Sequence, residues 1–363
     1  MSSNFPRVAL FSLMAGPMAC AGVLPRIDLP KDSPVAVLSS DPAGSSELSR
    51  GGAVVVDVHD ALTLRNAGER RIRGITLMVI AQDISPGGKA SVTVPSLNVA
   101  PGDTFPVRVD LRLLRPVQAA DGFVQITLDG VLFDDLSFYG PDRLSSRRAL
   151  TVYELEARRD RRYFRNLLEA GGPQRLQQEM LSAMSRSAER SGLAVQMVRG
   201  PATNYEPEHE MRFSFLQFPD APVQPGDGVV RVAANEARGP RVSIRNKSDE
   251  QVRSVELGWI VRDQQGREFL ADSLPTNLDL APGQSREIVQ DATLRLPMGV
   301  AGMTGFVRNV EFADQHVWIP SRTALSDPRL EQVLAPSPEE DRLIQIYKKK
   351  GLKALIQELK RFE

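Results

Sequence analysis

A chain of 363 residues exceeds the usual length of one domain, so it predicts two or more domains. Its hydrophobic content of 42% and charged content of 25% are ordinary for a globular protein and exclude wholesale disorder. Basic and acidic residues each number 45, and this balance excludes the basic excess on which nonspecific nucleic-acid binding depends.

The N-terminal segment 1–21 has the parts of a secretory signal peptide. Arg7 supplies a positive charge, residues 8–15 form an apolar run too short to span a bilayer, and Ala19-Cys20-Ala21 supplies small residues before a cleavage site. We therefore expect cleavage after Ala21 and export to the periplasm or the extracellular space. The alternatives are a lipoprotein acylated at Cys20 and a terminus without a targeting role.

Cys20 is the only cysteine, so its removal would leave a mature chain with no disulfide, no catalytic thiol and no cysteine-bound zinc. No later segment has the long uncharged apolar run of a transmembrane helix. The sequence therefore predicts no transmembrane segment in the mature chain.

Residues 22–50 are rich in serine, proline and aspartate and predict an extended arm. In the domain expected at 51–150, valines at 54, 56 and 58 alternate with other residues, a period-two pattern typical of half-buried strands. Turn signals at 66–68, 86–88 and 100–102 separate the strands. About seven short strands with regular turns indicate an antiparallel sandwich.

Residues 151–192 predict a helical hairpin, because Gly171 and Gly172 would end one helix and Pro173 suits the first turn of the next. The segment 193–228 is expected to be a connector. Its short strands include one with Met211 and Phe213 on the same face, and it ends in a proline- and glycine-rich linker at 219–228.

Residues 229–325 repeat the first domain in the same order. The repeated features are Arg65-Asn66 with Arg245-Asn246, 97–113 with 278–296, 122–124 with 305–307, and 131–135 with 310–314. The C-terminal helical segment, 326–363, repeats the helical part, since Gly351 and Leu355 recur at the spacing of Gly172 and Leu176. A repeat this long is a whole domain, so a unit of sandwich plus helices has been doubled.

An apolar strand, Arg-Asn-x-Gly/Ser, a second apolar strand and Leu-x-(Val/Leu)-Ala-Pro-Gly occur in order over 62–113 and 242–296. This pattern resembles the bacterial immunoglobulin-like domains of the CARDB, or cell-adhesion-related, type. The resemblance implies an extracytoplasmic binding or spacer module and transfers no functional residue. With the helices, the expected fold is mainly β with α: two immunoglobulin-like antiparallel β-sandwiches, each followed by a helical hairpin.

Two acidic segments carry candidate chemistry. Residues 206–210 place three glutamates around His209, which could bind a metal or transfer a proton, but no second histidine is near. Residues 133–142 gather Asp134, Asp135 and Asp142, which could hold calcium, but the EF-hand spacing is absent. Ordinary polar turns are the favoured interpretation of both.

Other segments also have a favoured structural interpretation. The basic runs 157–162 and 347–361 could contact anionic lipid or polysaccharide, but their acidic neighbours favour solvated helix faces. Asn246 begins a glycosylation triplet, yet it lies in the repeated turn. Asn66 and Asn246 are expected to close turns through hydrogen bonds to the backbone. Trp259 and Trp318 are expected to pack in cores.

The sequence has no nucleophile motif and no glycine-rich phosphate-binding fingerprint, so no catalytic, cofactor-binding or metal-binding residue is predicted. We interpret the chain as an exported, noncatalytic interaction or scaffolding protein of the bacterial cell envelope. The expected partner is an envelope or extracellular protein, or a glycan, and not a nucleic acid. The alternatives are a carbohydrate-binding module protein and an enzyme whose carboxylate pair is assembled by the fold.

Overall fold

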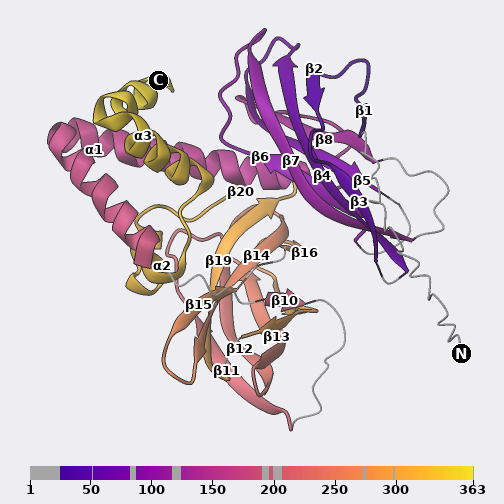
Figure 1. Cartoon of the computed structure of the whole chain (residues 1–363). Helices are drawn as coiled ribbons and strands as arrows, with labels where there is room; N and C mark the ends of the chain where they lie inside the picture. The colour runs from indigo at the N-terminus through magenta and orange to yellow at the C-terminus, as the bar shows by residue number, and fades with distance from the viewer. Residues whose placement is uncertain are drawn as a thin grey trace, which may run out of the picture. The chain divides into compact units, whose positions relative to one another are not determined.

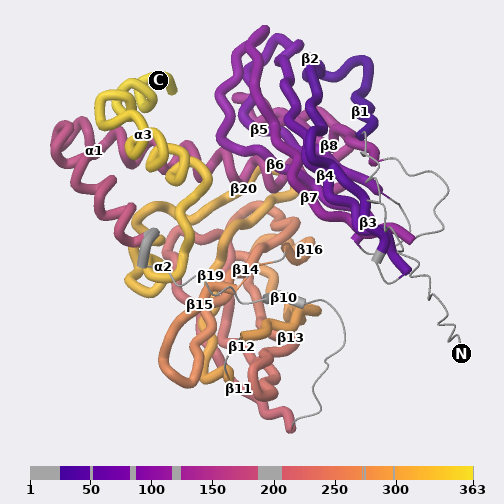
Figure 2. The backbone as a smooth tube through the Cα atoms, viewed as in Figure 1, coloured from indigo at the N-terminus to yellow at the C-terminus, as the bar shows by residue number. Residues whose placement is uncertain are grey.

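The computed structural model describes residues 25–50, 52–81, 87–116, 124–189, 196–198, 207–271, 273, 275–296 and 299–362 (Figures 1 and 2). The predicted signal peptide, with Cys20, lies outside these residues. The described chain is mainly β, with several sheets and three α-helices, which confirms the expected β-rich, sandwich-like class. None of its helices combines the length and the apolar character needed to cross a membrane.

The chain divides into two compact units. Unit 1 comprises Met1–Arg70, Thr76–Val92 and Val99–Asp129, and unit 2 comprises Arg71–Ile75, Thr93–Asn98 and Gly130–Glu363. Strands β5 and β8 run from one unit into the other, since each contains residues of both.

The strands up to residue 139 form two sheets. The first has the order β1 (Arg26–Asp28), β8 (Gln125–Phe133), β5 (Ile72–Ile80) and β6 (Lys89–Val94), with β9 (Phe138–Tyr139) also on β8. The second is centred on β4 (Ala53–Asn66), which has β7 (Thr104–Pro116) along one edge and both β2 (Val35–Asp41) and β3 (Ser46–Arg50) along the other.

Strand β4 confirms the predicted alternation. Val54, Val56 and Val58 are buried, whereas the residues between them are exposed or half-buried. The facing strand β7 buries Val107 and Val109 in the same way. Because successive side chains of a strand point to opposite faces, one face of this sheet forms the core and the other faces solvent.

A larger sheet follows in unit 2. Its order is β10 (Gln196–Val198), β18 (Thr293–Arg295), β13 (Glu236–Asn246), β12 (Val223–Ala233), β11 (His209–Phe215), β19 (Val300–Phe312), β14 (Val252–Asp263) and β15 (Glu268–Ala271). Three further strands join it, namely β16 (Pro275–Leu280) on β14, β17 (Ser285–Val289) on β13 and β20 (Val317–Trp318) on β19. Trp259 is fully buried and packs edge-on against Phe213 and Phe215, as predicted for a core residue. Trp318 is partly buried against the same core.

Three helices and a 3₁₀ turn complete unit 2: α1 (Ser146–Glu189), η1 (Ala324–Ser326), α2 (Pro328–Val333) and α3 (Pro338–Lys360). Gly172 (φ 68°, ψ −173°) interrupts α1 and Gly351 (φ 78°, ψ 178°) interrupts α3, which confirms the two predicted breaks. Only glycine adopts such angles without strain. Leu176 and Leu355 follow these breaks and are buried in one core shared by α1 and α3.

The segments expected to be an extended arm and a linker both contain strands. The predicted arm, 22–50, contains β1, β2 and β3, and Val35 is 2% exposed where β2 pairs with β4. The predicted linker, 219–228, contains the start of β12, with a register shift between Pro225 and Gly228. The serine, proline and glycine content of the two segments did not indicate these strands, because strands at a sheet edge or beside a bulge tolerate such residues.

Each half of the chain contains a short parallel strand pairing. Arg26 of β1 pairs with Gln125 of β8, and Ser214 of β11 pairs with Thr304 of β19. The predicted match of 122–124 with 305–307 is not tested, because residues 122 and 123 lie outside the described residues.

The predicted turn role of Asn66 is confirmed and extends beyond one turn. This side chain is 1% exposed, and its Nδ2 donates to the carbonyl oxygens of Arg70 (2.8 Å) and Val99 (3.1 Å). Its Oδ1 accepts from the backbone N–H of Gly68 (3.1 Å). One buried amide thus joins the β4–β5 turn to the segment before β7.

Asn246 makes the same three kinds of contact in the second copy. Its Nδ2 donates to the carbonyl oxygens of Glu250 (2.8 Å) and Leu280 (2.9 Å), and its Oδ1 accepts from the backbone N–H of Ser248 (2.9 Å). It is fully buried. We call each set of contacts an asparagine clamp.

Substituting either clamp residue by alanine should destabilise the protein. Asn66→Ala or Asn246→Ala leaves two backbone carbonyls and one N–H without their side-chain partner, at an expected cost of about 2 kcal/mol in the free energy of unfolding. Urea denaturation measures this cost. Asn277→Ala is the matched control, because Asn277 is exposed on β16 and makes no side-chain hydrogen bond to the described residues. Equal midpoints for the three variants and the unmodified chain would contradict a clamp role.

Candidate functional site

A row of aliphatic side chains crosses the solvent face of the β3–β4–β7 sheet. Leu48 of β3 lies opposite Val55 of β4, and Val55 lies opposite Leu114 of β7. Side chains directly opposite one another on neighbouring strands share a face, and Val54 and Val56 occupy the other, buried face. Leu48 is 59% exposed and Leu114 is 43% exposed. We call Leu48, Val55 and Leu114 the outer apolar row.

Charged pairs border the outer apolar row on the same face. Arg112 donates from Nε to Oδ1 of Asp57 (2.7 Å) and from Nη2 to Oδ2 (3.3 Å), and this hydrogen bonding holds the pKa of Asp57 below its ordinary value. His59 Nδ1 lies 2.9 Å from Oδ1 of Asp110 in the next pair along β4. An apolar centre beside a polar margin is the usual composition of a protein-docking surface.

The described part of the candidate metal segment 206–210 does not form a cluster of metal ligands. Glu206 lies outside the described residues, and His209 and Glu210 are exposed on β11. The carboxylate of Glu208 contacts the guanidinium groups of Arg238 and Arg231. The structure therefore pairs Glu208 with arginines, and it brings His209 to no other ligand among the described residues.

Arg238 also joins Glu208 to a second carboxylate, Glu236. Glu236 is 0% exposed. Its carboxylate accepts hydrogen bonds from the guanidinium of Arg238 and from Nη2 of Arg295, the latter at 2.7 Å. Burial opposes its ionisation, but the hydrogen bonds and charges of the two arginines outweigh burial and hold its pKa below the ordinary value. Arg238 therefore pairs with two carboxylates, Glu208 and Glu236.

Glu236→Gln should reduce stability at neutral pH by about 3 kcal/mol, because it breaks a buried ion pair from one side. Since the folded pKa of Glu236 is lowered, its contribution is present above the ordinary glutamate pKa and is lost as the pH falls through the lowered value. Urea denaturation of the variant and the unmodified chain at pH 7 and near pH 3 should show a difference that shrinks in acid. A difference that stays constant with pH would contradict this role.

The aspartates of 133–142 bind the chain itself. Oδ1 of Asp135 accepts from the backbone N–H of Ser137 (3.0 Å), and Oδ1 of Asp142 accepts from the backbone N–H of Arg147 (2.8 Å) at the start of α1. Asp134 is exposed and its backbone N–H bonds to the carbonyl oxygen of Arg71 (3.0 Å). The carboxylates of Asp135 and Asp142 therefore hold a turn and the start of α1, while Asp134 is held through its backbone.

Glu250, Asp314 and His316 form the one group of potential metal ligands found among the described residues. All three are exposed, and His316 Nδ1 already contacts Oδ1 of Asp314 at 2.6 Å. The ring of His316 stacks on Phe312 with centroids 4.0 Å apart. Sequence reasoning missed this group because Glu250 is distant along the chain from the other two.

The basic run at 157–162 faces carboxylates of the same unit. Arg161 is 4% exposed on its side chain and lies 2.9 Å from Glu154, while Arg159 lies 3.0 Å from Asp160. Arg161 also reaches Glu339 of α3 at 3.4 Å. Arg161 therefore joins α1 to α3, which differs from the solvated helix face expected for this run.

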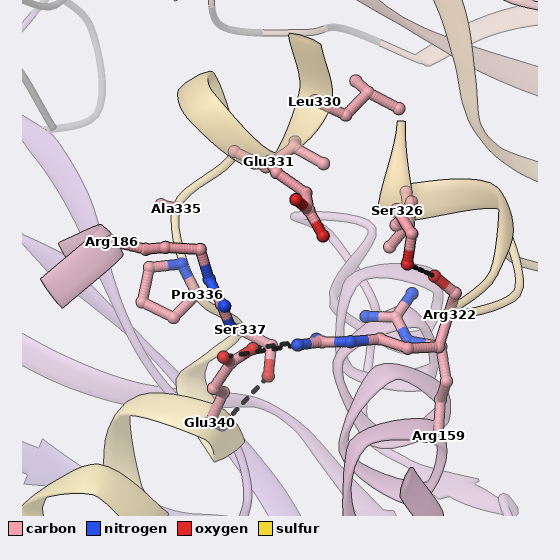
Figure 3. Close-up of a pocket in the computed structure, with 12 residues that line it drawn as sticks. Arg159, Arg186, Arg322, Ser326, Leu330, Glu331, Ala335, Pro336, Ser337 and Glu340 are labelled. Carbon is pink, nitrogen blue, oxygen red and sulfur yellow. Dashed lines mark hydrogen bonds and ion pairs between the residues drawn. The ribbon is translucent and has the colours of Figure 1, made fainter. Parts of the chain in front are cut away.

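A small cavity of about 60 Å³ lies beside this network (Figure 3). Arg159 and Arg322 line it, but Arg159 donates to the carbonyl oxygen of Pro320 (3.1 Å) and Arg322 lies 2.9 Å from Glu340. Ser337 precedes α3, and its hydroxyl oxygen accepts from the backbone N–H of Glu340 (3.1 Å), which caps the helix. Figure 3 shows Arg322, Glu340 and Ser337 joined to one another by such contacts.

A neighbouring cavity of about 270 Å³ is lined by Tyr153 and Glu156 of α1, Phe306 and Arg308 of β19, and the segment 334–338. Burial raises the pKa of Glu156 and that of Tyr153. The positive charge of Arg308 opposes this rise in both groups but does not cancel it. Glu156 has no hydrogen bond or ion pair to the described residues. Sequence reasoning missed this carboxyl group, because nothing in the helical pattern of 151–192 places it beside β19.

No protein-family model matches this chain, and no curated protein matches it either. Among solved structures, it is similar to an ApaA protein from Bordetella pertussis, with 15% identity, a TM-score of 0.18, and coverage of 32% of this chain and 90% of the other. A beta-glucosidase from Kluyveromyces marxianus has 9% identity, a TM-score of 0.18, and coverage of 74% and 45%. A two-domain protein of unknown function from Bacteroides fragilis has 8% identity, a TM-score of 0.16, and coverage of 84% and 90%. Similarities at this level assign neither fold nor function.

Proposed function

We propose that this chain is an exported, noncatalytic interaction or scaffolding protein of the bacterial cell envelope that binds a protein partner. In this proposal it contains two immunoglobulin-like domains of the CARDB type, each followed by a helical hairpin. The observation that carries the proposal is the outer apolar row, Leu48–Val55–Leu114, on the solvent face of the β3–β4–β7 sheet.

The outer apolar row favours a protein partner over a glycan. Covering a leucine side chain completely is worth about 2 kcal/mol, so an exposed row of aliphatic groups gains most from an apolar surface. Sugar-binding surfaces rely on aromatic rings, and the row has none. The neighbouring Asp57–Arg112 pair supplies the polar margin that gives such a contact its orientation.

The asparagine clamps support the immunoglobulin-like interpretation. They give a physical reason for the repeated Arg-Asn-x-Gly/Ser pattern, because the Asn66 and Asn246 amides make equivalent contacts in the two copies. In the proposed organisation the domains span 51–150 and 229–325 and the helical parts span 151–192 and 326–363, with β1–β3 added before the first domain and β11–β12 before the second. In such an organisation the β-sheets present faces for binding, and binding of this kind needs no catalytic group.

Charge introduced into the outer apolar row should abolish partner binding. Leu48→Glu with Leu114→Glu places two carboxylates where the partner's apolar surface would lie, so we expect at least a roughly ten-fold loss of captured partner. Capture is measured by crosslinking tagged full-length protein in its native cells and quantifying the bound proteins by mass spectrometry.

The matched control is Ser39→Glu with Thr104→Glu, which adds the same charge to the far end of the same face. It should retain the partner. Equal capture by both double variants would exclude the outer apolar row as the docking surface, and equal unfolding midpoints would show that neither variant acts through instability.

The proposed export makes a separate prediction about the N-terminus. Intact-mass measurement of the protein from the periplasm or medium should give a chain that starts at Gly22. A chain starting at Cys20 with added lipid mass would establish the lipoprotein alternative. Recovery of only the complete chain, starting at Met1 or Ser2, from the cytoplasm would overturn export.

A further inference from the structure

Strands β11 and β19 of unit 2 diverge from a short parallel contact (Figure 1). They pair with each other only at Ser214–Thr304 and Phe215–Gly305. Before this point β12 is the one strand that pairs with β11 among the described residues, and β19 pairs with β14 on the edge opposite β11. Among the described residues, the facing edges at 209–213 and 301–303 therefore have no strand partner.

A cavity of about 710 Å³ occupies the space between these two edges. It is lined by four consecutive residues of β11, from Met211 to Ser214, and four consecutive residues of β19, from Ala301 to Thr304. Consecutive side chains of a strand point to opposite faces, so a cavity that touches four in a row must follow the strand edge. We call this space the β11–β19 cleft.

The two sides of the cleft differ in chemistry. On the core side, Met211 and Met303 present flexible apolar side chains. On the solvent side, Arg212 and Arg262 are exposed and make no hydrogen bond or ion pair to the described residues, and the Arg262 guanidinium lies over Gly302.

The other charged groups of the cleft leave it positive. Arg329 binds Glu268 at 2.7 Å, so these two charges cancel. Asp227 is the remaining carboxylate in the lining, against Arg212 and Arg262. One uncancelled positive charge therefore faces solvent beside two open strand edges.

We propose that the β11–β19 cleft binds an extended segment of a partner protein in which acidic and apolar residues alternate. The segment adds as a strand, its backbone pairing with an open edge of β11 or β19. Its apolar side chains point toward Met211 and Met303, and its acidic side chains point toward Arg212 and Arg262. The inference rests on the proposed protein-binding function and assigns the partner chemistry and a second contact region.

Short parallel pairings already occur in this chain. Strand β1, of three residues, pairs in parallel with β8, and β11 pairs in parallel with β19 over two residues. Strand addition draws affinity from main-chain hydrogen bonds and specificity from alternate side chains. An added segment of a few residues would therefore extend a kind of pairing that the fold already contains.

The test uses two fluorescent heptapeptides and full-length protein. One alternates valine with glutamate and the other alternates valine with lysine, and fluorescence anisotropy measures their binding. We expect the glutamate peptide to bind roughly ten-fold more tightly than the lysine peptide. The inference would be overturned if neither peptide bound at concentrations up to about 1 mM, or if the two peptides bound with equal affinity.

Backbone methylation separates strand addition from simple charge attraction. Methylating the amide nitrogens of the valines blocks hydrogen bonds along one edge of the peptide, and methylating those of the glutamates blocks the other edge. We expect at least one of the two patterns to abolish binding. If neither weakens binding, the peptide does not add as a strand.

Charge reversal locates the site. Arg212→Glu with Arg262→Glu should weaken binding of the glutamate peptide about ten-fold or more and favour the lysine peptide. Arg245→Glu on β13 is the matched control, because Arg245 is also exposed on a strand and makes no ion pair with the described residues. Equal loss in the control would mean that the peptide binds elsewhere.

The outcome for the cleft can be separated from the outcome for the proposed function. The Leu48→Glu, Leu114→Glu protein should bind the glutamate peptide unchanged, since those residues belong to unit 1. Partner capture lost in that variant, together with no peptide binding by the unmodified chain, would retain the proposed function and reject the cleft. Peptide binding by the unmodified chain without any captured partner would retain the cleft and reject the proposed function.

Discussion

Each copy of the repeat depends on one buried side-chain amide that satisfies three backbone groups at once. Asn66 and Asn246 replace the water that would otherwise solvate two carbonyls and one N–H at the meeting of two loops. A buried backbone group without a partner is costly, so the loops can be buried only while the amide is present. Each clamp therefore ties the turn after its own strand to the segment before a later strand.

The helical part depends on a different interaction, a network of buried charges. Arg161 lies between Glu154 of α1 and Glu339 of α3, and all three side chains are almost fully buried. Such pairs contribute little net stability compared with apolar contacts, but removing one partner leaves an uncompensated charge. The network therefore specifies how α1 meets α3, while the shared core around Leu176 and Leu355 supplies the apolar burial.

Local patterns in the sequence predicted the local structure well. The alternation of valines predicted β4, Gly172 and Gly351 predicted the helix breaks, and the asparagines predicted the turns. The pairing of the strands within 22–50 and 219–228 was not predicted, because short or bulged strands owe their pairing to neighbours rather than to composition. The outer apolar row and the β11–β19 cleft could not be predicted, since both depend on which residues face one another across strands distant in sequence.

The unequal lengths of the corresponding strands have an evolutionary consequence. Strand β4 begins at Ala53, thirteen positions before its clamp residue, whereas β13 begins at Glu236, ten positions before its own. Val55 therefore lies on a part of β4 for which β13 has no counterpart, and the β11–β19 cleft in turn uses the first half of β11, which the three-residue β1 lacks. If the two copies arose by duplication, as the repeated sequence predicts, the shared clamps would stay under common constraint. The residues added to each copy would then be free to diverge and to take on separate tasks.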